Sequence, residues 1–105
     1  MQGPVFAAYR TLLGLQRAEL AELLRVGERS IRAWESERSP IPDEIANKVE
    51  KMIAAQGDLA GKMASHNGTV IMPRTGGHGY PRGFYMAALG RALEHNPQIS
   101  TAWES

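Results

Sequence analysis

The stretch LQRAELAELLRVGERSIRAWESER, residues 15–38, decides the fold of this chain. Apolar residues recur at helical spacing in two short segments on either side of a turn, which predicts two helices that meet at a fixed angle. The predicted inner faces consist of Leu20, Ala21 and Leu24 in the first helix and of Ile31 and Trp34 in the second, with Val26 in the turn. The stretch therefore predicts a helix-turn-helix.

The outer face of the second helix carries the candidate DNA-binding residues. Arg29 and Arg32 are three residues apart and share this face, where a guanidinium can form two parallel hydrogen bonds to a guanine edge or a phosphate. A solvated surface is the alternative for both arginines, but their place in the motif favours DNA contact. Glu28 either stabilises the helix N-terminus, which is the favoured reading, or accepts a hydrogen bond from cytosine. Ser30, Ser36 and Arg38 are candidate phosphate contacts. Gln16, at the start of the first helix of the motif, is a further candidate DNA-binding residue.

Composition excludes several classes of protein. The chain has 105 residues, no cysteine and a net charge of only +1, which argues against a disulfide scaffold, a zinc ribbon and a non-specific nucleic-acid coat. Its three histidines lie far apart in sequence, and the glycine-rich loop 75–79 lacks the lysine of a phosphate cradle, so we expect no metal, no cofactor and no catalytic residues. With neither an export signal nor a membrane-spanning run, the expected location is the cytoplasm.

Elements outside this stretch can be placed from the same spacing rules. A first helix with Phe6, Tyr9, Leu12 and Leu13 on one stripe should end at Gly14, and residues 39–42 form a proline-stiffened connector. A long helix should then run from residue 43 to about residue 66. The residues of its inner face are spaced alternately by four and three positions, so this face could pack either against a helix of a partner or against its own domain. The face consists of Ile45, Val49, Met52, Gln56, Leu59 and Met63.

The C-terminal part reads as a short β-prone run at 69–72, a glycine-rich loop at 74–83, a helix at 84–94 and one further helical turn at 99–103. The run at 69–72 should pair with the strand of a second copy, lie against the last helix or be disordered, because a lone strand does not persist. Trp103 is expected to pack onto the body, with an exposed ring as the less favoured alternative. The expected fold is mainly α, with a five-helix DNA-binding domain at 1–66 that includes the long helix and a small dimerisation region at 67–105. The expected dimer interface consists of Val70, Ile71, Met72, Phe84, Tyr85, Leu89, Met52, Leu59 and Met63.

Residues 9–53 resemble the Cro and lambda-repressor (Xre-type) class of helix-turn-helix regulators, through the pattern LAELLxVxxxxIxxWE and its proline-rich exit. The resemblance implies a bundle of about five helices and dimers that bind inverted-repeat operators. It places base contacts at Glu28, Arg29 and Ala33, with Arg32 adjacent, and a phosphate contact at Arg17. Gln16 stands where the class usually has the threonine or serine that caps its second helix, Arg25 replaces the usual turn glycine, and Gly27 replaces a capping serine.

A narrower resemblance spans both halves of the chain. VGERSIRAWESERSPIPDEI and PRGFYMAALGRALEHNPQISTAW are similar to segments of the anti-CRISPR-associated regulators. This resemblance implies an autorepressor of a phage or mobile-element operon with a dimerising C-terminal region.

The sequence thus predicts a homodimeric transcriptional repressor that binds double-stranded DNA at an inverted-repeat operator. An antitoxin-type module is a rival hypothesis, in which residues 69–105 are disordered until they bind a protein partner. An RNA-binding regulator that uses the same arginines is another. An enzyme is the weakest alternative.

Overall fold

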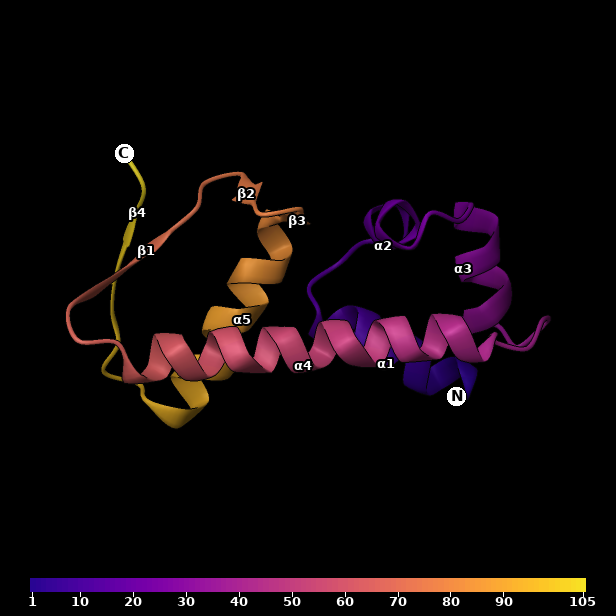
Figure 1. Cartoon of the computed structure of the whole chain (residues 1–105), viewed down its shortest axis with the longest axis horizontal. Helices are drawn as coiled ribbons and strands as arrows, with labels where there is room; N and C mark the ends of the chain where they lie inside the picture. The colour runs from indigo at the N-terminus through magenta and orange to yellow at the C-terminus, as the bar shows by residue number, and fades with distance from the viewer. The chain divides into compact units, whose positions relative to one another are not determined.

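The computed structural model describes all 105 residues and contains five helices and four short strands. The helices are α1 (Gly3–Leu12), α2 (Arg17–Leu24), α3 (Glu28–Glu35), α4 (Asp43–Ser65) and α5 (Arg82–His95). The strands are β1 (Thr69–Met72), β2 (Gly76–Gly77), β3 (Tyr80–Pro81) and β4 (Ser100–Trp103). Figure 1 shows their order along the chain. The prediction of a mainly α fold with a short β-strand is confirmed, with four helices in residues 1–66 and the fifth in residues 67–105.

The chain divides into two compact units, residues 1–53 and 54–105, and α4 contributes residues to both. The domain boundary expected at residues 66 and 67 therefore differs from this division. The physical reason is that Ala60 and Met63, in the C-terminal part of α4, are buried in one cluster with Val70, Met72 and Ala88. These helix residues complete the core of the second unit.

The first unit has its core where the apolar spacing predicted it. Its fully buried side chains are Phe6, Leu13, Leu20, Ile31 and Val49. Leu12 is a correction to the predicted stripe, because 41% of it is exposed. At about 100° per residue, Leu12 is turned well away from Phe6 and Leu13, and a helix this short buries only one narrow face. The connector at residues 39–42 is non-helical, as predicted.

Residues 99–103 were expected to form a helical turn, and this expectation is wrong. Residues 100–103 form β4, which pairs in parallel with β1 from Thr69↔Ser100 to Met72↔Trp103 (Figure 1). The pairing continues past the strand, where the backbone N–H of Glu104 donates to the carbonyl of Met72 at 2.9 Å. A lone four-residue strand is not stable, so β4 of the same chain provides the partner that β1 requires, a pairing that was not among the expected states of residues 69–72. Trp103, expected to pack onto the body, is 42% exposed.

The glycine-rich loop contains a small antiparallel hairpin, β2–β3, which the sequence analysis did not identify. Its turn residues His78 and Gly79 have φ of 50° and 86°, and positive φ at both central positions is the requirement of a type I′ turn. The Tyr80 ring stacks on Phe84 with centroids 3.8 Å apart, and the Tyr85 hydroxyl donates to the carbonyl of Gly77. The hairpin is thereby attached to the first turn of α5.

A polar contact joins α4 to α5 inside the second unit. The fully buried side chain of Gln56 donates from Nε2 to the carbonyl of Phe84 at 3.2 Å, and its Oε1 accepts from Arg91 at 3.0 Å. Gly57, one residue further, leaves room for the same guanidinium, since a Cβ there would lie 3.0 Å from Arg91 Nη2. Both ends of the buried amide are therefore hydrogen-bonded.

None of the five helices combines the length and the apolar composition that a membrane crossing requires.

Candidate nucleic-acid interface

The candidate interface is built on α3, whose inner side chains fix the helix in the first unit. Ile31 is fully buried and Trp34 is 8% exposed. The Trp34 ring meets Phe6 of α1 edge to face, with centroids 5.9 Å apart and planes at 73°. Because these side chains hold one face of α3 inward, the opposite face is held outward.

The outward face of α3 carries the residues that the sequence singled out. Arg29 and Arg32 are exposed, whereas Glu28, Ser30 and Ala33 are half-buried along the edges of the same face. The arginines therefore project into solvent, which is the condition for entering a major groove. Arg29 forms no ion pair in the structure.

Arg32 is paired with Glu28 one turn earlier in α3. Its Nη2 lies 3.0 Å from Glu28 Oε1, and the two side chains are 58% and 41% exposed. An exposed pair of this kind is weak, so a DNA phosphate or guanine can replace the carboxylate. Besides the two roles expected of Glu28, the structure thus shows an ion pair with Arg32 on the same helix.

Glu35 joins α1, α2 and α3 through two arginines. Its carboxylate lies 2.6 Å from Arg10 Nε and 2.9 Å from Arg17 Nε, and its side chain is only 8% exposed. Arg10 also donates from Nη1 to the carbonyl of Leu15 at 3.0 Å. Arg17, the predicted phosphate contact, is 45% exposed and therefore remains reachable from solvent.

The two arginines determine the charge state of Glu35. Burial alone would raise its pKa, but hydrogen bonds from Arg10 and Arg17, together with their positive charges, outweigh burial and hold the pKa of Glu35 below its usual value of 4.5. The carboxylate is consequently charged at neutral pH, as both ion pairs require.

Three of the predicted DNA-binding residues meet in one open pocket of about 450 Å³. It is lined by Arg17 from α2, by Arg32 and Glu35 from α3, by Ser36 and by Ala7 of α1. Ser36 caps α3, and its hydroxyl lies 3.3 Å from the carbonyl of Ala33. The hydroxyl of Ser36 donates its proton to that carbonyl, so the donors that the fold brings to this concave surface for DNA phosphates are the two arginine guanidinium groups.

The turn between α2 and α3 depends on a residue in a left-handed conformation. Arg25 has φ 57° and ψ 46°, and the next residue, Val26, donates from its backbone N–H to the carbonyl of Ala21 at 3.0 Å. This arrangement closes the end of α2 in the way that normally uses glycine. Gly27 then precedes α3 with extended backbone and provides no side-chain cap.

Replacing Arg25 by glycine is expected to stabilise the protein by about 1 kcal/mol, because glycine adopts the left-handed region without the Cβ clash. Thermal unfolding should show a rise in Tm of several degrees. Arg25→Ala is the matched control, since alanine removes the same charge but keeps the Cβ. A rise for alanine as large as that for glycine would assign the effect to charge instead.

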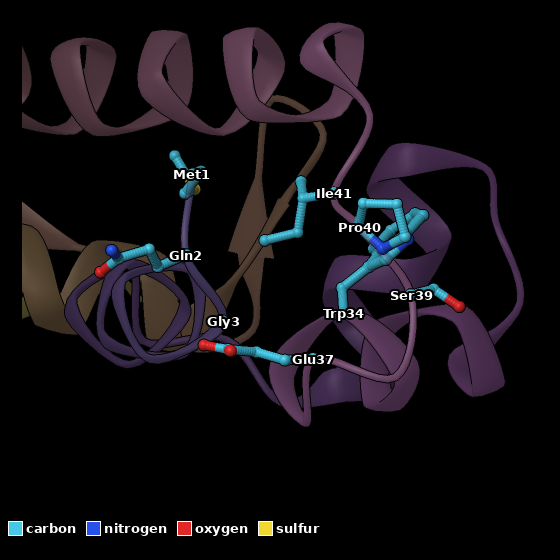
Figure 2. A pocket seen from close by; sticks show the side chains of 8 residues that line it. All are labelled: Met1, Gln2, Gly3, Trp34, Glu37, Ser39, Pro40 and Ile41. Carbon is cyan, nitrogen blue, oxygen red and sulfur yellow. The ribbon is translucent and has the colours of Figure 1, made fainter.

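The chain leaves α3 beside the start of α1, where the structure has a pocket of about 340 Å³ (Figure 2). Gly3 is placed so close to α3 that a Cβ would lie 2.6 Å from the carbonyl oxygen of Glu35 and 2.8 Å from that of Trp34. Glu37 has φ 65° and turns the backbone toward the connector. The lining consists of Met1, Gln2, Gly3, Trp34, Glu37, Ser39, Pro40 and Ile41.

Two further predicted residues lie at helix ends. Gln16 is the N-cap of α2, and its backbone N–H donates to Glu19 Oε1 at 2.8 Å, which provides part of the capping that a threonine or serine would give. Arg38 is exposed beyond α3 and forms no ion pair. Both positions are accessible to a phosphate backbone.

The residues expected at a dimer interface fall into three groups. Val70, Met72, Phe84 and Met63 are at most 9% exposed and are covered by their own chain. Ile71 is 58% exposed on β1. The half-buried members are Met52, Leu59, Tyr85 and Leu89. Within this set, Ile71 and the half-buried residues are the ones that a second copy could contact.

Sequence reasoning missed Glu35 and Arg10. The sequence analysis assigns no role to Arg10, and Glu35 appears there only as the last letter of the pattern LAELLxVxxxxIxxWE. A signal was present, because a charged residue directly after the buried Trp34 lies at the border of the inward face of α3. That position predicts a partly buried carboxylate, which needs a positively charged partner.

Comparison with known proteins supports the same domain. Residues 6–53 match the model of a protein family described as helix-turn-helix. The matched range includes α1 from residue 6 onward, all of α2 and α3 and the first half of α4, and thus every predicted DNA-binding residue. A comparison of the chain with curated proteins finds no match.

Proposed function

We propose, from the premise that residues 6–53 are a helix-turn-helix domain of a DNA-binding transcription regulator, that the protein is a sequence-specific repressor. In this proposal two copies bind an inverted-repeat operator and place their α3 helices in successive major grooves, about 34 Å apart. Repression follows from the occupation of an overlapping promoter. The likeness to anti-CRISPR-associated regulators supports autoregulation of a phage or mobile-element operon.

One observation carries the proposal. Arg29 and Arg32 project from the exposed face of α3, while Ile31 and Trp34 anchor its opposite face. Base recognition needs hydrogen-bond donors held in a fixed orientation, and a helix whose opposite face is buried in the domain core provides that orientation. Ser30 and Ala33 flank the arginines on this face, and Ala33 can contact only a thymine methyl group.

Selection of bound duplexes from a random DNA pool tests the proposal directly. We expect one recurring motif, repeated in inverted orientation, with half-site centres about one helical turn apart. Measurement of the mass of the complex on the selected DNA would give the number of copies bound. Recovery of unrelated sequences, or of a single unrepeated half-site bound by one copy, would contradict the repressor dimer.

Replacing Arg38 by glutamine should weaken binding to every duplex by a similar factor, because in this proposal Arg38, which is exposed beyond α3, contacts phosphate and not base edges. The slope of log Kobs against log salt concentration should become shallower by about 0.9 for each lost phosphate contact. Titrations at several salt concentrations, on the selected operator and on a scrambled duplex, measure both effects. A loss confined to the operator would show that Arg38 contacts bases instead.

The rival antitoxin hypothesis expects residues 69–105 to be disordered without a partner. In the structure this segment contains α5 and four strands, and its Val70, Met72, Phe84 and Ala88 are buried. Such an ordered core does not favour the antitoxin hypothesis. Amide hydrogen exchange of the purified protein would decide, with slow exchange expected in α5 and in the β1–β4 pair.

A further inference from the structure

The second unit carries a cluster of two arginines and a tryptophan, outside the helix-turn-helix domain. Arg74 follows β1, Arg82 begins α5 and Trp103 ends β4. The Cζ atoms of Arg82 and Arg74 lie 4.9 Å and 5.9 Å from the centroid of the Trp103 ring, which is 42% exposed. The three side chains alone line an open pocket of about 290 Å³.

Arg74 is held in place by the residue after β4. Its backbone N–H donates to Glu104 Oε1 at 2.8 Å, and its Nε donates to the carbonyl of Glu104 at 2.9 Å. Because only Nε of the guanidinium is used, both terminal nitrogens keep their donors. The Glu104 carboxylate cancels one of the two positive charges, so the group of four residues keeps a net charge of +1.

Arg82 lies where a positive charge is least favourable for the helix itself. It is the first residue of α5, whose first turn has no acidic residue and whose N-cap, Pro81, provides no side-chain acceptor. The free backbone N–H groups and the helix dipole already make this end positive. The Arg82 guanidinium contacts the Trp103 ring and has no ion-pair partner. Helix end and guanidinium thus both favour an anion.

From these contacts we infer that Arg74, Arg82 and Trp103 form a phosphate-binding site. A guanidinium that packs on an aromatic ring keeps the N–H groups at its edge free for the oxygens of a phosphate. Contact with the rigid ring also limits the motion of the guanidinium before a phosphate binds. Two sources share this chemistry, the backbone of a DNA strand and a free phosphate compound. Bound DNA is the expected source, and this part of the inference rests on the proposed function.

The indole N–H signals of the full-length protein test the site. The chain has two tryptophans, so Trp34, which is 8% exposed in the first unit, is an internal reference for Trp103. We expect pyrophosphate and a non-operator duplex each to shift the Trp103 signal, and pyrophosphate to leave the Trp34 signal in place. No shift of Trp103 with either ligand would overturn the inference. A shift with pyrophosphate alone would support the site but assign it to a free phosphate compound.

Arg82→Gln is the decisive variant, with Lys62→Gln as the matched control. Lys62 is an exposed residue of α4 in the same unit, so both variants remove one charge. Arg82→Gln should abolish the pyrophosphate-induced shift and make the salt dependence of duplex binding shallower by about 0.9 in slope, whereas Lys62→Gln should change neither. An unaltered signal of the buried Gln56 side-chain amide, which lies in the same unit as the substitutions, confirms that the variants fold, and Arg74→Gln provides a second variant. A Trp103 shift that persists in Arg82→Gln would overturn the site.

The two proposals fail in different ways. If the protein does not bind a selected operator, the repressor proposal fails and the pyrophosphate titration still decides the site. If operator binding is intact while Trp103 responds to no phosphate, only the site is lost.

Discussion

Replacing Glu35 by glutamine is expected to lower the free energy of unfolding by about 3 kcal/mol, near the lower end of the cost of breaking a buried ion pair. Arg10 is only 16% exposed and would remain buried without its counter-charge, while Arg17 would lose its partner. Urea unfolding at neutral pH measures the loss. The variant should also hold α1 less firmly against α3, because Glu35 is the charged link between these helices.

Glu28→Gln is the matched control for Glu35→Gln. It removes the same charge from the same helix, but its pair with Arg32 is exposed, so we expect a loss below about 1 kcal/mol. Equal losses for the two variants would show that burial of the Glu35 cluster does not matter. The double variant Arg10→Met with Glu35→Gln should lose less than the sum of the single changes, because the buried arginine charge is then absent too.

The cost of Glu35→Gln should depend on pH with a definite sign. The folded-state pKa of Glu35 lies below 4.5, so its charged form stabilises the fold at every pH above the unfolded-state pKa. This contribution is lost as the pH falls through the folded-state pKa, where the wild-type carboxyl group becomes neutral like the amide. The wild-type and variant curves should therefore converge in acid. A difference that stays constant into acid would contradict the assigned ion pairs.

Replacing Arg29 or Arg32 by alanine should weaken binding to the selected operator by about 1–3 kcal/mol, or about 5- to 150-fold, and relax base preference at one position in each half-site. Both residues are exposed on α3, so the fold should be unaffected. Repeating the DNA selection with each variant shows which base position loses its preference. Binding equal to that of the parent would remove these residues from the interface.

Arg32→Lys separates base recognition from charge. Lysine keeps the positive charge but lacks the planar fork, so it should retain the salt dependence of binding while it loses part of the base preference. A lysine variant with unchanged preference would mean that Arg32 contacts phosphate and not a base edge.

The helix-turn-helix could be predicted from the sequence because its signals are local. Ile31 and Trp34 are buried as predicted, because a spacing of three and four residues fixes which side of a short helix is apolar. Burial of that side leaves Arg29 and Arg32 outside. The exposed face of the candidate interface therefore followed from periodicity alone.

The features that the sequence analysis missed depend on residues far apart in the chain. Thr69 pairs with Ser100, and no local pattern in residues 100–103 indicates that β1 will lie beside them. Glu35 meets Arg10 across 25 positions of sequence, which requires α1 to be placed against α3 first. In both cases the deciding contact exists only after the chain has folded.

The buried amide of Gln56 has a consequence for how uniquely the second unit folds. The apolar core of this unit includes Ala60, Met63, Met72 and Ala88. Such side chains alone would tolerate a shift of α5 along α4, since contacts between apolar surfaces lose little free energy when they slide. An amide that must satisfy a carbonyl at one end and a guanidinium at the other permits a single alignment. We therefore expect Gln56 to determine the position along α4 at which α5 is fixed.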